Sequence, residues 1–244
     1  MRTLVVFPLL FAPLIAFADC SEHLSGWATA LHPKLAFDRE HAVCKPNPAD
    51  ATQVVAALTF AKTIDENRQG DYDLDVLVAD AASGAVIAHH YQRAAISSDA
   101  IQFASLSLDT ARYQLSPQVR AFGVRVTYDG ASRVNPFSST TLNLYALDGT
   151  RLRRLMDKLT VSQDGGEWDG TCTGDFSQTR RTLSLGEPGK HGFASLRVSE
   201  KTTTSHAAAK GDDCQETDAK PTTATFTLDY DGSQYGVPSG LSFR

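Results

Sequence analysis

The sequence has no excess of positive charge, and this absence limits the partners that the protein can have. Its 244 residues carry 23 Lys and Arg against 28 Asp and Glu, which gives a formal net charge of −5 at pH 7. The basic residues do not gather into a cluster along the chain. Such a chain has no electrostatic footprint for nucleic-acid phosphates or for anionic lipid. We therefore expect no nucleic acid among its partners.

Long apolar runs are also missing after the first eighteen residues. That N-terminal stretch, MRTLVVFPLLFAPLIAFA, combines Arg2, an apolar segment, and the small residues Ala16 and Ala18. This order is typical of a secretory signal peptide that is cleaved after Ala18. The run is shorter than the roughly 20 residues that a membrane-spanning helix needs. We expect residues 1–18 to be a signal peptide, no membrane span, and a periplasmic or secreted location in a Gram-negative envelope.

Catalytic signatures are absent as well. The sequence contains no G-x-S-x-G, no H-E-x-x-H and no Gly-rich phosphate loop. Glu167 and Asp169 have the side-by-side placement that a glycosidase could use, although carboxylates so placed on a turn more often face solvent. A carboxylate-based hydrolase that acts on envelope polysaccharide or peptide therefore stays an alternative. We expect no cofactor.

The four cysteines show no C-x-x-C spacing, which disfavours a thiolate metal site. An even number of cysteines in an exported chain predicts two disulfides, for which three connectivities are possible. We favour Cys20–Cys44 and Cys172–Cys214, because each pair flanks its own irregular, polar segment. On the chain-entropy model each bond would contribute roughly 3–4 kcal/mol to stability.

From residue 51 onward the sequence has the pattern of β-strands. Apolar or alternating runs of strand length follow one another, and five Asp-Gly dipeptides interrupt the second half of the chain. Asp-Gly suits tight hairpin turns, and Asp148-Gly149 lies between two apolar runs. About ten short strands joined by hairpins predict a mainly β protein, an antiparallel sandwich or a barrel-like domain, over residues 51–244. No long amphipathic helix interrupts the strands.

Residues 19–50 differ from this pattern. Four apolar residues there have helical spacing, and Pro33 would end the helix that they predict: Leu24, Trp27, Ala28 and Leu31. The two prolines that follow Cys44 indicate an extended connector. We expect a small N-terminal helical cap that Cys20–Cys44 holds against the β domain.

The stretch GDYDLDVLVADAASGAVIAHH, residues 70–90, combines alternating aspartates with two adjacent histidines. It predicts a hairpin with its turn at Ser83-Gly84. Tyr72, Leu74, Val76 and Val78 would form the buried face, and the three aspartates, Asp71, Asp73 and Asp75, would face solvent.

Metal binding by this stretch is not expected. His89 and His90 would point to opposite faces of a strand, and the other histidines have no ligand spacing toward them. The aspartates do not complete an EF-hand template, because the closing carboxylate is missing. An irregular calcium loop from Asp65, Asn67, Asp71 and Asp73 is the remaining alternative, and it would make this a calcium-dependent structural protein.

The stretch SQDGGEWDGTCTGDFSQTRR, residues 162–181, is the most unusual in the chain. Its glycines and aspartates around one tryptophan predict a structured loop, which Cys172–Cys214 would hold against a solvated excursion at residues 201–223. Two roles stay open for Trp168, a core plug or an exposed recognition aromatic. Arg180 and Arg181 would pair with Glu167 or Asp175, or would bind an anionic group.

This loop is our candidate recognition surface, because Trp and Arg are enriched in binding hot spots. The candidate binding residues are Trp168, Arg180, Arg181 and Glu167. The partner would be an envelope protein or a glycan. The sequence therefore favours a non-catalytic role in binding or in envelope maintenance.

Four segments resemble a family of exported proteobacterial proteins of unknown function: CKPNPADATQVVAAL, DLDVLVADAASG, DGASRVNPFSSTTLNLY and GGEWDGTCTGDFSQTRRTL. The resemblance extends over most of the chain after residue 18. It implies a Gram-negative envelope or secreted location and assigns no activity to any residue.

Overall fold

The computed structural model describes residues 20–66, 69–211 and 213–243. The predicted signal peptide, 1–18, lies outside these residues. The helical elements are η1 (Cys20–His23), α1 (Leu24–Leu31) and η2 (Ser239–Leu241). The first four strands are β1 (Ala36–Pro46), β2 (Gln53–Ala61), β3 (Gly70–Asp80) and β4 (Val86–Ser98). The others are β5 (Ile101–Ser116), β6 (Val119–Gly130), β7 (Phe137–Asp148), β8 (Arg151–Trp168), β9 (Gly174–Pro188), β10 (Ala194–Lys210), β11 (Asp213–Asp218) and β12 (Thr222–Leu228).

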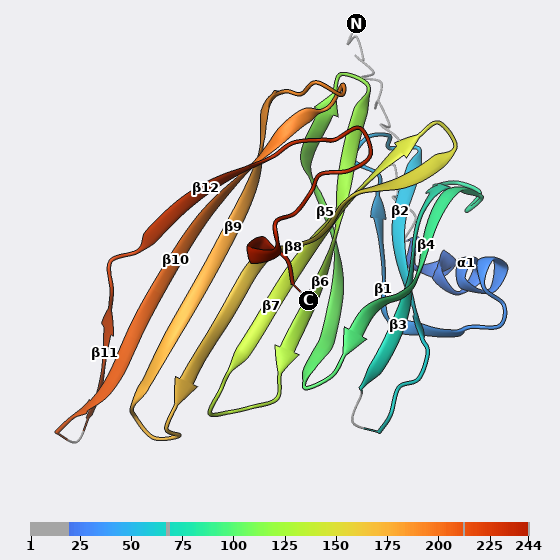
Figure 1. Cartoon of the computed structure of the whole chain (residues 1–244). Helices are drawn as coiled ribbons and strands as arrows, with labels where there is room; N and C mark the ends of the chain where they lie inside the picture. The colour runs from blue at the N-terminus through green and yellow to red at the C-terminus, as the bar shows by residue number, and fades with distance from the viewer. Residues whose placement is uncertain (1–19, 67–68, 212, 244) are drawn as a thin grey trace, which may run out of the picture.

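The strands form two antiparallel sheets of unequal width. One has four strands in the order β1-β2-β3-β4, and the other has eight, in the order β11-β10-β9-β8-β7-β6-β5 with β12 paired to β10. The small sheet lies on one side of the large one, toward β5 and β6, and β9 to β12 extend away from it (Figure 1). The prediction of a mainly antiparallel β protein is confirmed, and of its two forms the sandwich-like arrangement is the one found. The strands are longer than predicted, because several continue through turn-like sequences.

The first hydrophobic core fills the space between the two sheets. Val76 of β3 and Ile96 of β4 pack in one cluster with Phe122 of β6 and Tyr145 of β7, and all are almost completely buried. Alternation along each strand places these residues on the facing sides of the sheets. This core therefore reaches only as far as the small sheet does.

Helix α1 covers the outer face of the small sheet, as the helical spacing predicts. Trp27 is buried there against Leu58 and Leu77, and its Nε1 donates a hydrogen bond to the carbonyl oxygen of Gly84, 2.7 Å away. Gly84 has a φ of +70°, and a Cβ there would lie 2.8 Å from the His23 ring, so the β3–β4 turn needs glycine. Among the described residues, no helix combines the length and the apolar character needed to cross a membrane.

The predicted N-terminal cap is only partly a cap. Its helix and the Cys20–Cys44 disulfide are found, but Ala36–Pro46 forms β1, which pairs with β2. The pattern of β1 is weak because it is an edge strand with half-buried and charged residues. Ala36–Pro46 is therefore part of the small sheet.

The prediction that the aspartates of β3 face solvent is wrong for two of them. Asp73 is 4% exposed and Asp75 is 0% exposed. The alternation itself is correct, but α1 and its flanking residues cover the outer face of the small sheet, so both faces of β3 are buried. The hairpin turn at Ser83-Gly84 is confirmed by the hydrogen bond from the Asp80 N–H to the Ala85 carbonyl oxygen.

The C-terminal segment closes a second core on the large sheet. Strand β9 pairs with β8 only up to Arg180, which faces Ser162. Beyond that point the chain after β12 takes its place, and the N–H of Tyr235 donates to the carbonyl oxygen of Leu155, 2.7 Å away. This segment crosses β8 in Figure 1. It covers a cluster that joins β7, β8, β10 and β12.

The location of this second core predicts the effect of two leucine substitutions. Leu144 is 0% exposed within it, whereas Leu185 on β9 is 39% exposed. Leu144→Ala should lower the free energy of unfolding by about 2–5 kcal/mol. Leu185→Ala should lower it by less than about 1 kcal/mol. Urea denaturation followed by circular dichroism measures both, and an equal loss for the two variants would contradict this placement of the core.

Candidate functional site

The large sheet continues well beyond the hydrophobic cores as a single layer. We call this part the extension and define it as residues 162–181, 199–211 and 213–218. None of these residues belongs to the hydrophobic clusters or packs against one. They are exposed or half-buried, apart from Gly174. In Figure 1 the extension is the part of β8 to β11 that points away from α1 and the small sheet.

This arrangement corrects two predictions made from the sequence. Residues 162–181 are not a loop: β8 runs to Trp168, β9 begins at Gly174, and only the turn between them is irregular. Asp164-Gly165, expected at a turn, lies inside β8 and pairs with β9. The excursion expected at 201–223 consists of strand β10, strand β11 and the start of β12. Polar composition concealed these strands, because neither of their faces is covered.

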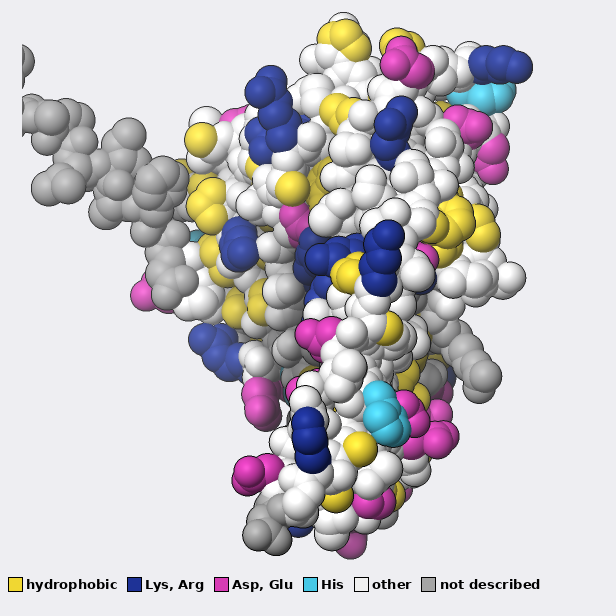
Figure 2. Space-filling model, turned by 90° about the vertical axis from the view of Figure 1, so that its left-hand side faces the viewer, with side chains coloured by type: hydrophobic (Ala, Val, Ile, Leu, Met, Phe, Trp, Pro, Cys, Tyr) yellow, Lys and Arg dark blue, Asp and Glu magenta, His cyan; other side chains and the backbone are white. Residues whose placement is uncertain are grey.

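One face of the extension contains a groove of about 590 Å³. We call it the polar groove. Four carboxylates line it, and no Lys or Arg of the described chain does. Its lining is Asp129, Gly130, Ser132, Pro136, Phe137, Ser138, Asp164, Gly165, Phe176, Ser177, Gln178, Thr203, Thr204, Ser205, Glu216 and Asp218. Seen from the side on which β11 lies, much of the surface is uncharged polar side chains and backbone, with hydrophobic side chains in small groups and several Lys and Arg side chains near the middle (Figure 2).

Asp164 organises the floor of the polar groove. Its carboxylate accepts hydrogen bonds from Arg180 Nη2 at 2.9 Å and from Gln178 Nε2 at 2.8 Å. Partial burial would raise the pKa of Asp164, but the hydrogen bonds and the charge of Arg180 outweigh it and lower the pKa. Asp164 therefore stays ionised and fixes the direction of the Gln178 amide. On the neighbouring strands, Ser205 Oγ donates to Glu216 Oε1 at 2.6 Å.

Phe176 is the aromatic side chain of this face, and two glycines make room for it. A Cβ on Gly166 would lie 2.5 Å from Phe176 Cδ1, and one on Gly174 would lie 3.0 Å from Cε2. The ring therefore lies across bare backbone on the neighbouring positions of β8 and β9. Gly166 and Gly174 therefore serve strand packing, whereas Gly170, with a φ of +85°, does lie in the turn.

The four predicted binding residues do not form one cluster. Trp168 pairs with Gly174 at the end of β8, whereas Arg180 pairs with Ser162. Six residues of strand separate these pairs, which is about 20 Å at the usual rise per residue. Glu167 precedes Trp168 on the strand and is exposed. A small ligand could not contact Trp168 and Arg180 together.

The two arginines are engaged in ion pairs, though not with the predicted partners. Arg180 pairs with Asp164 at 2.9 Å, and Arg181 pairs with Glu200 at 2.7 Å. Arg181 also donates from Nη1 to the carbonyl oxygen of Thr160 at 2.8 Å, and its side chain is only 10% exposed. The prediction of pairing with Glu167 or Asp175 is therefore wrong. Arg181 contributes to the packing beside the core rather than to the surface.

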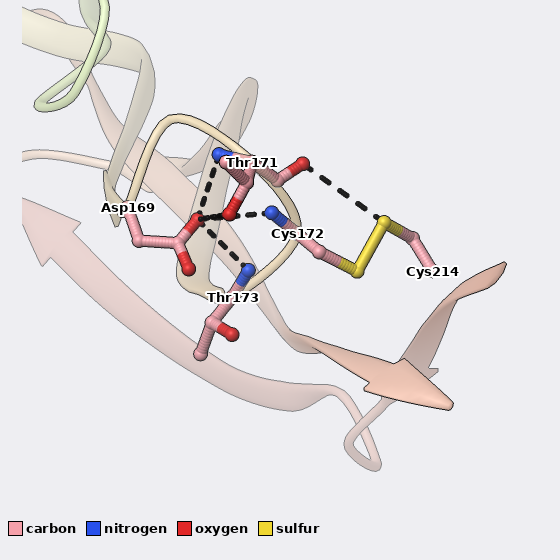
Figure 3. The surroundings of a disulfide bond; sticks show 5 residues. All are labelled: Asp169, Thr171, Cys172, Thr173 and Cys214. Carbon is pink, nitrogen blue, oxygen red and sulfur yellow. Dashed lines mark hydrogen bonds between the residues drawn. A yellow bond between two sulfur atoms is a disulfide. The ribbon is translucent and has the colours of Figure 1, made fainter. Parts of the chain in front are cut away.

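The predicted disulfide Cys172–Cys214 is present and joins the β8–β9 turn to β11 (Figure 3). Within that turn, one oxygen of Asp169 accepts hydrogen bonds from the N–H groups of Thr171, Cys172 and Thr173 at 2.8–3.0 Å. Asp169 is thus a turn cap.

A separate polar cluster lies on the outer face of the small sheet. His32 Nε2 is 2.7 Å from Asp75 Oδ2, and His89 Nδ1 is 2.9 Å from the same oxygen. His89 and His90 do point to opposite faces, as predicted, and the His90 ring contacts the buried Tyr145 ring edge-on, with centroids 5.8 Å apart. No other histidine has ligand spacing toward His89 in the sequence, but His32 lies beside it here, because His32 follows α1 and both histidines contact Asp75.

Asp73 lies next to this cluster on the same face of β3. It accepts hydrogen bonds from Tyr91 Oη at 2.6 Å and from the N–H of Ala94 at 2.7 Å. Burial, together with the hydrogen bond to Asp73, raises the pKa of Tyr91 to about 12. The calcium loop that we considered stays a prediction: of its members, Asp71 accepts a hydrogen bond from Ser97 Oγ at 2.7 Å. Its remaining member, Asn67, lies outside the described residues.

Comparison with known proteins adds no name to this fold. No protein-family model, no curated protein and no solved structure matches the chain. The resemblance to exported proteobacterial proteins therefore stays a prediction.

The turn in Figure 3 gives a direct electrostatic prediction. The hydrogen bond from the Thr171 N–H, followed by the others at this turn, lowers the pKa of Asp169 from 3.8 to about 2. The stabilisation that this carboxylate gives to the turn should be complete above pH 3.8 and should be lost as the pH falls through about 2. Carboxyl-carbon NMR measures the titration. Thr171→Ala removes the Thr171 Oγ1 hydroxyl, which also donates to Asp169 at 3.0 Å, and should raise the midpoint. A midpoint near 3.8 in the unchanged protein would refute the cap.

Proposed function

We propose that this is an extracytoplasmic binding protein that holds a neutral glycan in the polar groove. Two disulfides support the location, since such bonds persist in oxidising compartments. The N-terminal sequence, with its signal-peptide pattern, supports it as well. The observation that carries the proposal is the extension, a single-layer sheet with a polar groove and no hydrophobic core of its own.

The extension adds little to the stability of the fold. Its strands bury no hydrophobic cluster, while ordering each residue costs about 1–2 kcal/mol of conformational entropy. The ladder pairs of β8 to β11 and the Cys172–Cys214 disulfide hold it in shape. We infer that a sheet held in shape without a hydrophobic core of its own serves to bind a ligand.

The chemistry of the polar groove favours a neutral sugar over other ligands. Sugars present hydroxyl groups, which pair with carboxylates, amides and hydroxyls, and an apolar C–H face, which packs on an aromatic ring. Asp164, Gln178 and Ser205 supply the first kind of group, and Phe176 supplies the second. Asp129, Glu216 and Asp218 make the lining acidic, whereas the charge of Asp164 is paired with Arg180, and no Lys or Arg among the described residues lines the groove. This disfavours anionic ligands.

A protein partner fits this groove less well than a glycan does. The cores of protein interfaces are enriched in aromatic residues and depleted in charged ones. Here the large exposed hydrophobic residues are single and lie outside the groove: Leu35, Ile87, Val134 and Leu185. Arg180 is neutralised by Asp164, so it does not provide an anion site either.

The proposal predicts that groove variants lose glycan binding. The protein should bind neutral oligosaccharides of N-acetylglucosamine or glucose, and Phe176→Ala or Gln178→Ala should weaken binding about 10-fold, the loss expected for one ring contact or hydrogen bond. Isothermal titration calorimetry measures the affinities. Ser184→Ala is the matched control, since Ser184 is exposed on the same strand but lies outside the groove.

The outcomes separate the alternatives that the sequence left open. Equal affinities for the groove variants and the control, or no binding of either oligosaccharide series, would contradict the proposal. Release of shortened sugars during the titration would instead support a hydrolase. Trp168→Ala should weaken binding only of ligands long enough to reach the end of β8, and Arg181→Ala should not change it. Loss of binding in Arg181→Ala would instead favour the recognition surface that the sequence predicts around Trp168 and the two arginines.

A further inference from the structure

The three side chains on the outer face of the small sheet have the geometry of metal ligands. The nearest ligand atoms of His32, Asp75 and His89 all lie within 4.8 Å of one another. Zinc bonds of 2.0–2.2 Å in a tetrahedral site place neighbouring ligand atoms about 3.4 Å apart. The present separations of 2.7 Å and 2.9 Å from Asp75 need only small ring movements to reach this value. We propose that His32, Asp75 and His89 form a zinc site.

The need for a cation at this place comes from two buried carboxylates. Asp73 and Asp75 lie two residues apart on one face of β3 and are 4% and 0% exposed. Like charges so placed repel each other, and a buried carboxylate needs a compensating charge. Among the described residues, no Lys or Arg forms an ion pair with either carboxylate, and the pairs at Asp75 are those with the two histidines. A divalent cation would balance both charges.

The surroundings hold the ligands in place. Tyr91 stacks on the His32 ring at a centroid distance of 4.3 Å and donates its hydroxyl proton to Asp73. The Phe60 ring contacts the His32 ring edge-on, with 5.0 Å between the two ring centroids. His32 also caps the C-terminus of α1, where its N–H donates to the Ala28 carbonyl oxygen. The partial negative charge at a helix C-terminus favours a cation nearby.

The donor set selects zinc among the common cations. Two imidazole nitrogens and one carboxylate oxygen suit Zn²⁺, whereas Ca²⁺ and Mg²⁺ need shells made almost entirely of oxygen. Zn²⁺ also undergoes no redox change, which suits a chain that carries disulfides. Three protein ligands leave the fourth position for water or for a group from outside. The His89 side chain is 41% exposed, so this position faces solvent.

The test is a titration of the metal-free protein with ZnCl₂, with a fluorescent zinc chelator as competitor. We expect one zinc ion per chain with His32, Asp75 and His89 intact. His89→Ala should abolish this site, and the protein should stay folded because His89 is at the surface. His90→Ala, one residue away but on the inner face, and His206→Ala, which removes an exposed His–Asp pair, are the controls and should still bind.

Two further measurements make the outcome decisive. Co²⁺ in place of zinc should give the visible absorption of a four-coordinate site, and the absorption should disappear in His89→Ala. Tyr91→Phe keeps the ring beside His32 and removes only the hydrogen bond to Asp73, which is not a ligand, so zinc binding should persist. Zinc binding that is unchanged in His89→Ala, or absent from the folded protein, would overturn the proposal. Neither result depends on whether the polar groove binds a glycan.

Discussion

Unequal cover of the large sheet is the constraint from which the rest of this structure follows. A four-stranded sheet packs on an eight-stranded one, so the core between them ends where the small sheet ends. The C-terminal segment covers part of what remains and closes the second core, to which Tyr235 contributes. Beyond the second core, β8 to β11 continue without contact to either hydrophobic cluster. Hydrogen-bonded pairing and the Cys172–Cys214 disulfide are left to hold them, and the disulfide joins the turn and the strand that lie farthest from either core.

The same constraint separates the two candidate sites. The extension is exposed on both faces, so its side chains are free to be polar and the groove around Asp164 can be shaped for a ligand. The small sheet is covered on both faces, so its polar residues are buried and must be paired. Asp75 is the clearest example: it lies under the end of α1 between two imidazoles. One site is polar because nothing covers it, whereas the other places a fully buried carboxylate, Asp75, beside two histidines, of which His89 is 41% exposed.

Sequence patterns predicted the class of fold, the first helix, the hairpin at Ser83-Gly84 and both disulfides, since each depends on local spacing or on which segments a cysteine flanks. They failed where a residue's surroundings are set by distant parts of the chain. The alternation in β3 was correctly identified, but nothing local reveals that α1 covers Asp75. His32 is 43 positions from Asp75 and has no spacing motif with it. The sequence predicted loops where the extension has strands, because an uncovered sheet needs no apolar alternation and is rich in glycine and threonine. Gly166, for example, makes room for the Phe176 ring on the neighbouring strand.

We propose that the extension binds its ligand as a sheet of regular strands and is not an irregular loop. Backbone NMR of the protein, recorded with and without a neutral N-acetylglucosamine oligosaccharide, tests it most directly. We expect the backbone chemical shifts of regular β-strands for residues 174–181 and 199–210 in the free protein. We also expect ligand-induced changes that concentrate at Phe176, Gln178, Thr203 and Ser205. Random-coil shifts in these strands, or changes confined to the small sheet, would contradict it.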